Sequence, residues 1–186
     1  MIRRVSLFLR RVRKREDGGP SIEFVLIFPP ILLLIVSAFE LGLLMTRHVM
    51  LERGMDMAVR EVRLNTNVQF DEIMIKRMVC NAAGIIPNCM DRLYLEMNSV
   101  DLRETNGVSA ATVPRNASCT DVVDPFELRP EFENGSANEM MVVRACARLV
   151  PMLPETGLGY FLSRMEGSEN GFYRLVSTSA FVMEPI

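Results

Sequence analysis

An uncharged apolar run near the N-terminus constrains this chain more than any other feature. Residues 24–39 read FVLIFPPILLLIVSAF and contain no charged side chain. The wider stretch 22–46 is interrupted only by Glu23 and Glu40. As a helix it would be about 37 Å long, which exceeds the roughly 30 Å of a bilayer's hydrocarbon core. The run therefore predicts a single transmembrane helix, to which we assign residues 19–46.

Basic side chains are concentrated just before this run. Residues 1–17 hold seven of the chain's 21 basic residues and only two of its 23 acidic ones. The positive-inside rule then puts residues 1–18 in the cytoplasm as a basic leader, and residues 47–186 outside. No DNA-binding pattern follows the basic cluster, so we expect no nucleic-acid partner.

The helix is expected to continue beyond the membrane as an amphipathic stem, ending near Asn65. Its apolar residues recur along one helical face: Leu44, Leu51, Met55, Ala58 and Val62, with the chain's single histidine, His48, in the same stripe. Charged side chains occupy the opposite face. Gly54 interrupts the stem at a cost of about 1 kcal/mol relative to alanine.

The rest of the chain predicts a small α+β domain. A second, short helix should begin after an Asp71 cap and end near Ala83, with Gly84 as its C-cap. A tight turn segment should follow to Cys89. Alternating or continuous apolar residues predict about three strands, mostly antiparallel, at residues 93–98, 140–150 and 172–183. A polar loop over 101–138 and a short helix over 160–165 would connect them.

The four cysteines, Cys80, Cys89, Cys119 and Cys146, all lie beyond the membrane segment. An even number in an exported domain favours disulfides over buried free thiols, with three possible pairings. Their spacing includes no Cys-x-x-Cys and the chain has one histidine, so we expect no metal site.

Catalytic motifs are not apparent in the sequence. His48 is interpreted as a packing or interface residue, and Thr156-Gly157-Leu158-Gly159 as a turn rather than a phosphate-binding loop. We therefore expect a protein that is not an enzyme and needs no cofactor.

The start of the apolar helix carries a more specific pattern. The basic leader ends at Gly18, and Glu23 stands five residues later at the edge of the run. A carboxylate in a membrane helix is a functional hypothesis by default. The alternative is a harmless position at headgroup level, where the helix dipole favours a negative charge.

Residues 18–30, GGPSIEFVLIFPP, resemble the processing site of TadE-type pseudopilins: a leader ending in glycine, a glutamate at mature position five and a proline in the helix. The resemblance extends to Phe39-Glu40-Leu41-Gly42, to the stem over 58–63, to the Cys80 and Cys89 pair and to the closing segment 182–185. It is dense over residues 18–63 and sparse afterwards.

The resemblance implies a minor, pilin-like component of the tight-adherence (Flp) pilus machinery of bacteria, supporting pilus biogenesis and surface adhesion. A prepilin peptidase would cut between Gly18 and Gly19, and the partners would be other pilins or pseudopilins, the assembly machinery and membrane lipid. The protein would be a single-pass inner-membrane protein with its C-terminal domain periplasmic or extracellular. The new amine at Gly19 could pair with Glu23 within a subunit or between neighbours, and Pro29 and Pro30 would kink the helix or unwind it locally.

For the disulfides we predict Cys80–Cys89, which would join a helix end to the turn beyond it, and Cys119–Cys146, which would tie the long loop to the central strand. Two other interpretations of the whole chain stay open. A signal peptidase could cut after Val36-Ser37-Ala38 and release a secreted domain. Alternatively, the chain could be a generic single-span protein with an external binding domain.

Overall fold

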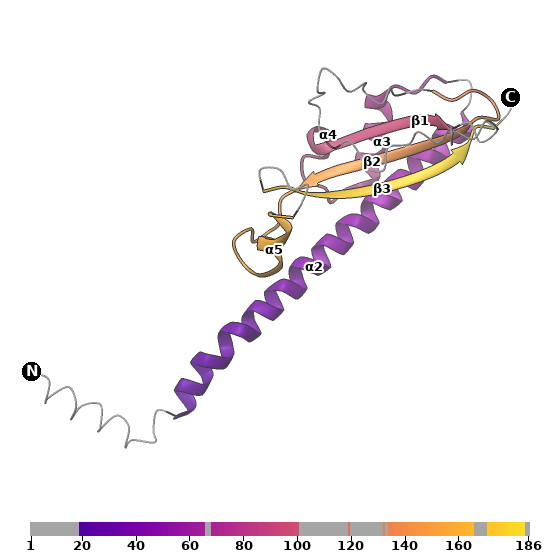
Figure 1. Cartoon of the computed structure of the whole chain (residues 1–186). Coiled ribbons are helices and arrows are strands. Elements are labelled where there is room, and N and C mark those ends of the chain that lie inside the picture. Colours follow the sequence, from indigo (N-terminus) through magenta and orange to yellow (C-terminus); the bar gives the residue numbers. More distant parts are fainter. Residues whose placement is uncertain are drawn as a thin grey trace, which may run out of the picture.

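The computed structural model describes residues 19–65, 68–100, 119, 132, 134–165 and 171–184. The elements follow in the order α2 (Gly19–Leu64), α3 (Glu72–Ala83), α4 (Cys89–Arg92), β1 (Leu93–Val100), β2 (Met140–Leu149), α5 (Gly157–Leu162) and β3 (Tyr173–Val182). The sheet and α3 lie beside the C-terminal half of α2, and the N-terminal half of α2 extends away from them (Figure 1).

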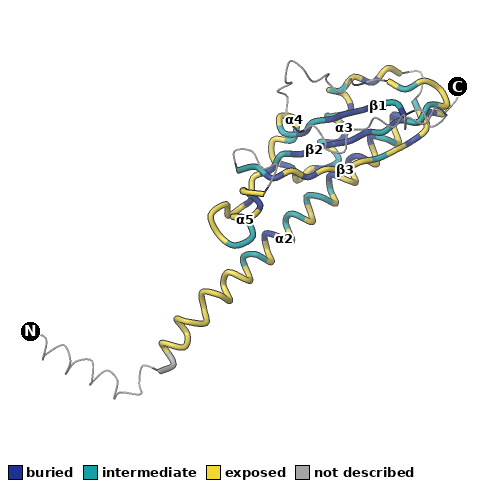
Figure 2. Tube along the Cα trace, in the orientation of Figure 1, coloured by how far each residue is buried: buried dark blue, intermediate teal, exposed yellow. Residues whose placement is uncertain are grey.

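Helix α2 is one continuous element of 46 residues, about 69 Å long at the usual rise per residue. Its stem carries the expected buried stripe: Leu51, Met55, Ala58 and Val62 are all at most 3% exposed. Figure 2 shows the change along the helix, from exposed in its N-terminal half to alternately buried and exposed beside the domain. The predicted amphipathic stem is confirmed.

Helix α3 packs across the stem at a glycine. Ile75, Val79 and Ala83 form its buried face. A Cβ atom added at Gly54 would lie 2.7 Å from the carbonyl oxygen of Val79, closer than real Cβ atoms approach. The glycine that weakens the stem as an isolated helix therefore allows α2 and α3 to cross closely. Asp71 and Gly84 flank α3 as expected, and Gly84 has a φ of 53°.

The three strands form one antiparallel sheet in the order β1-β2-β3. Ala145 of β2 stands opposite Leu95 of β1 and Ser177 of β3. One face of the sheet packs on the helices and contributes half of the core residues: Leu93, Leu95, Met97, Met141, Val143, Ala145, Ala147, Leu149, Tyr173, Leu175 and Phe181. The predicted α+β fold, with a long first helix and a three-stranded antiparallel sheet, is confirmed.

Two local predictions were wrong. Residues 156–159 are not a turn: Thr156 is the N-cap of α5, with extended backbone angles of −134° and 146°, and Gly157 begins the helix. This helix therefore starts three residues before the predicted 160–165. Its first turn packs on α2, where the N–H of Leu158 donates to the Ser37 hydroxyl. The segment around Cys89 also holds a short helix, α4, that was not expected. Most of the predicted loop 101–138 lies outside the described residues.

Candidate membrane anchor and subunit-contact site

The first turn of α2 brings two of the predicted site residues together. Gly19 is the first residue of the helix, and Glu23 follows four residues later. Residues at this spacing lie on the same helical face, about 6 Å apart. Glu23 is exposed. An amino group created at Gly19 would therefore be within reach of the Glu23 carboxylate, whose side chain leans toward the helix N-terminus. Gly18 lies outside the described residues.

The next four turns of α2 are bare. Every residue from Ser21 to Ile35 is exposed, although almost all are large and apolar. Phe24 and Phe28 stack on each other with ring centroids 4.9 Å apart. Among the described residues α2 is the one helix long and apolar enough to cross a membrane. An apolar surface of this extent fits a single-pass membrane anchor.

Helix α2 stays helical through Pro29 and Pro30, so the local unwinding considered for these residues is absent from the structure. The two prolines have no backbone N–H, which leaves the carbonyl groups of Val25 and Leu26 without their usual donors four residues ahead. A kink at this point stays a prediction.

C-terminal to these exposed turns, α2 is contacted by the segment that connects β2 to β3. We call residues 150–165, which join β2 to β3 and include α5, the foot. Glu40 of α2 is only 3% exposed, and its Oε1 accepts a hydrogen bond of 2.8 Å from the backbone N–H of Met152. The hydroxyl of Ser37 accepts a longer bond, 3.3 Å, from the N–H of Leu158. Two polar side chains of the apolar helix are thus used to hold the foot.

A third contact lies at the top of the foot. The Nη1 atom of Arg47 donates to the Tyr173 hydroxyl at 2.9 Å and to the carbonyl oxygen of Val150 at 3.4 Å. Arg47 therefore holds α2 to the point where the chain leaves β2 and to the point where it enters β3.

The two glycines of α5 each lie where a side chain would not fit. A Cβ on Gly157, whose φ is 54°, would lie 2.5 Å from the Ser37 hydroxyl oxygen. A Cβ on Gly159 would lie 2.2 Å from the carbonyl oxygen of Leu153, which is backbone of the foot itself. One glycine is needed for docking on α2 and the other for the fold of the foot.

These features fall within, or pack against, a segment that can be compared with known proteins. A family model described as TadE-like protein matches residues 20–60. This segment is TadE-like. No curated protein and no solved structure matches the chain. Over residues 20–60 the match confirms the resemblance noted in the sequence, and it suggests a component associated with tight-adherence pili.

The TadE-like segment includes Glu23, the bare turns, Glu40 and most of the stem, but none of the cysteines. The structure contains both disulfides of the predicted pairing: Cys80–Cys89, which joins α3 to α4, and Cys119–Cys146, which joins Cys119 to β2. The described residues include no free cysteine. Disulfides are typical of exported domains.

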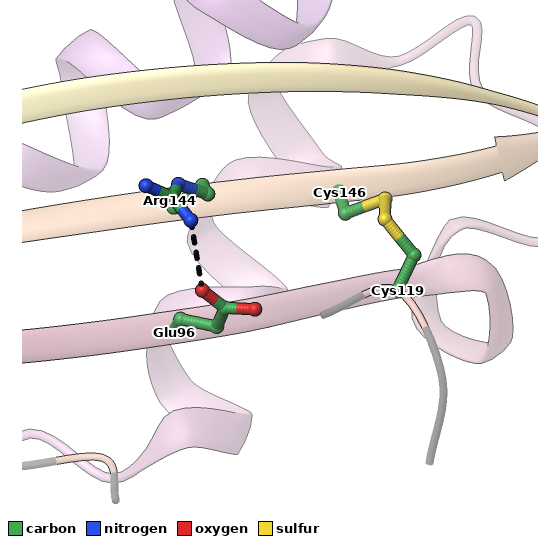
Figure 3. Close-up of polar contacts among 4 residues, drawn as sticks. All are labelled: Glu96, Cys119, Arg144 and Cys146. Carbon is green, nitrogen blue, oxygen red and sulfur yellow. Dashed lines mark hydrogen bonds and ion pairs between the residues drawn. A yellow bond between two sulfur atoms is a disulfide. The ribbon is translucent and has the colours of Figure 1, made fainter. Parts of the chain in front are cut away.

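The face of the sheet turned away from the TadE-like helix carries a buried ion pair. Glu96 of β1 and Arg144 of β2 stand directly opposite each other, 3.5 Å apart, and are 5% and 9% exposed. Figure 3 shows this pair beside the Cys119–Cys146 disulfide on the same strand. An arginine in a strand predicted from its apolar run is therefore accounted for by a carboxylate on the neighbouring strand.

The described residues include no group of three or more His, Cys, Asp or Glu side chains that could hold a metal ion. His48 is partly exposed, and its Nδ1 lies 3.6 Å from Glu52 Oε1 one turn further along the stem.

Sequence reasoning missed three residues that hold the foot: Ser37, Arg47 and Gly157. The sequence did contain signs of this contact: polar residues in an apolar helix, and two glycines after Thr156. They lie far apart in the sequence, however, and only the structure shows that they meet. Glu40 was noticed only as an interruption of the apolar run and as part of the resemblance.

Proposed function

We propose that this protein is a minor, pilin-like component of the tight-adherence pilus machinery, anchored in the bacterial inner membrane by α2. The observation that carries the proposal is the coincidence of the TadE-like match at 20–60 with a helix that is bare over Ser21–Ile35. The leader before Gly19 is cytoplasmic, and the disulfide-bonded domain is periplasmic or extracellular. Its role is structural rather than enzymatic.

Maturation begins with a cut between Gly18 and Gly19 by a prepilin peptidase on the cytoplasmic side. The cut removes the basic leader and leaves an ammonium group on the first residue of α2. That group lies about one helical turn from Glu23, which supports a direct interaction between the two charges. Pairing lowers the cost of moving either charge into an apolar environment.

Assembly then uses the exposed half of α2. In the membrane its apolar side chains contact lipid, and in an assembled complex they contact the same helix of neighbouring pilins or pseudopilins. The Glu23 carboxylate of one subunit can then form a salt bridge with the N-terminal ammonium group of the next. This contact is specific, because burying a lone carboxylate among apolar helices without a cationic partner is costly.

Two other interpretations fit less well. A signal-peptidase cut after Ala38 would remove Ser37, which accepts a hydrogen bond from the foot, and would sever α2 just before the buried Glu40. A generic single-span protein has no need for the TadE-like pattern of residues 20–60.

The test is the mature N-terminus of the protein isolated from membranes of cells that contain a prepilin peptidase. We expect Gly19 in the wild type and an uncut, heavier precursor in Gly18→Phe, because the peptidase site admits a small residue only. Gly42→Phe is the matched control: a Cβ at Gly42 meets nothing within 4 Å, so this variant should be cut normally. A Phe39 or Met1 start in the wild type, or normal cutting of Gly18→Phe, would contradict the proposal.

A further inference from the structure

The length of the bare part of α2 sets a limit on where the membrane ends. The run from Ser21 to Ile35 spans 15 residues, or about 22 Å of helix, whereas a hydrocarbon core is about 30 Å thick. Tilting the helix shortens its reach across the bilayer further. If Glu23 lies at headgroup level, the bare apolar part begins only at Phe24. The acyl chains must therefore extend beyond Ile35, to the turns of α2 on which the foot packs.

The foot presents an apolar surface at that level. Its exposed large apolar side chains are Val150 (37%), Met152 (57%), Leu153 (42%), Tyr160 (38%), Phe161 (67%) and Met165 (59%). In Figures 1 and 2 the foot lies beyond the end of the sheet, beside α2 on the side of its bare half, and much of its surface is exposed. Apolar side chains in a segment of this length would be an aggregation risk in water.

The charges of the foot are few and suit an interface. Residues 150–165 include only Glu155 and Arg164 as charged side chains. The guanidinium of Arg164 lies over the Tyr160 ring, 4.2 Å from its centroid, and that ring meets the Phe161 ring edge-on at 5.7 Å. Tyrosine and arginine are enriched where acyl chains meet headgroups, since each has an apolar body and a polar end.

Resting on the proposed membrane anchor, we propose that the foot is a second membrane contact: residues 150–165 lie in the outer half of the bilayer that α2 spans. Phe161 and its apolar neighbours are surrounded by lipid near the headgroups. The folded domain is thereby fixed in height and orientation on the membrane surface, rather than held only by a single helix.

In this arrangement the Glu40–Met152 hydrogen bond shields a carboxylate from lipid. Glu40 lies 16 residues after Phe24, a depth of about 24 Å, which is still within the acyl chains. A carboxylate exposed to lipid there would be strongly unfavourable. The foot covers it, and the N–H of Met152 satisfies one of its oxygens at 2.8 Å. Glu40 thus draws the foot to α2 inside the membrane.

The chain contains no tryptophan, so single substitutions give unambiguous fluorescent probes. Three full-length variants are compared in phosphatidylethanolamine and phosphatidylglycerol vesicles whose acyl chains are brominated: Phe28→Trp in the span, Phe161→Trp in the foot and Val182→Trp at the far end of β3. All three positions are exposed, at 45%, 67% and 50%, so the substitutions should leave the fold intact. Retention of both disulfides and an unchanged melting temperature check this.

Bromine quenches tryptophan only in near contact. We expect strong quenching and blue-shifted emission for Phe28→Trp, and quenching of Phe161→Trp several-fold above that of Val182→Trp, strongest with bromines near the headgroup. Failure of Phe28→Trp to be quenched would refute the anchor itself. If Phe28→Trp is strongly quenched but Phe161→Trp is quenched no more than Val182→Trp, the proposal for the foot is overturned while the anchor stands. Blue-shifted, unquenched emission from Phe161→Trp that depends on protein concentration would also overturn it, because it would indicate a second copy on the foot.

Discussion

Truncating a buried methionine of the stem tests whether the outer part of α2 belongs to the folded domain. Met55 is 1% exposed and faces the core, whereas Met57, two residues further along the same helix, is 45% exposed. Changing each to alanine removes the same atoms in nearly the same sequence context. Only at Met55 does the change remove buried surface and leave a cavity between α2 and the elements packed on it.

The expected cost of Met55→Ala is about 2–5 kcal/mol, the range for large-to-small substitutions of fully buried aliphatic side chains. For a chain of this size each kcal/mol lowers the melting temperature by about 2–4 °C, so a central loss of about 3 kcal/mol corresponds to about 6–12 °C. Met57→Ala should stay within about 0.5 kcal/mol of wild type, since surface substitutions have small effects and alanine suits a helix.

The measurement is thermal unfolding of the full chain in detergent micelles, followed by near-ultraviolet circular dichroism of the domain's tyrosines and disulfides. Equal melting temperatures for Met55→Ala and Met57→Ala would refute the reasoning. That result would mean that the stem is not part of the cooperative unit and that the sheet and α3 fold without it.

Two further predictions concern assembly and the disulfides. Glu23→Gln should be cut and inserted normally but should no longer co-purify with other pilus components, because a neutral amide cannot neutralise the amine of a neighbouring subunit. Asp56→Asn, a matched change at an exposed position of the stem, should still co-purify with them, and equal assembly of both variants would contradict the role assigned to Glu23. Replacing Cys80 and Cys89 together by serine should lower the free energy of unfolding, measured by urea titration, by about 2–4 kcal/mol without affecting membrane association. An unchanged unfolding midpoint would show that this disulfide does not stabilise the packing of α3 and α4.

Much of the fold followed from patterns with a local cause. The stem could be predicted because a buried face on a helix repeats every three or four residues, and Leu51, Met55, Ala58 and Val62 keep that period. The strands at Leu93, Met140 and Tyr173 could be predicted because alternation or a short apolar run is the local sign of a pleated, buried strand. Cysteine spacing left three pairings open; the pairing that the structure has was proposed from the expected helix end, turn, loop and central strand, beside a resemblance that included the Cys80 and Cys89 pair.

The features that could not be predicted depend on residues that lie far apart in the sequence. Residues 156–159 were interpreted as a turn from their glycines, whereas Gly157 begins α5 and packs against Ser37 of α2. Gly54 was interpreted by its local cost, whereas its use depends on Val79 of another helix. Arg144 in an apolar strand found a partner in Glu96, 48 residues away along the chain, once the two strands had paired.

The sequence by itself determined that a long apolar helix starts near a glycine and a glutamate, that its outer half is amphipathic, and that an α+β domain follows. These properties are local, because hydrophobic periodicity, charge and capping act over a few residues. Only the tertiary structure decided that Glu40 and Ser37 hold the foot and that Gly157 lies against Ser37. Those contacts join residues more than 100 positions apart, and no local pattern specifies which polar group of one element will satisfy which of another until the sheet has formed and brought them together.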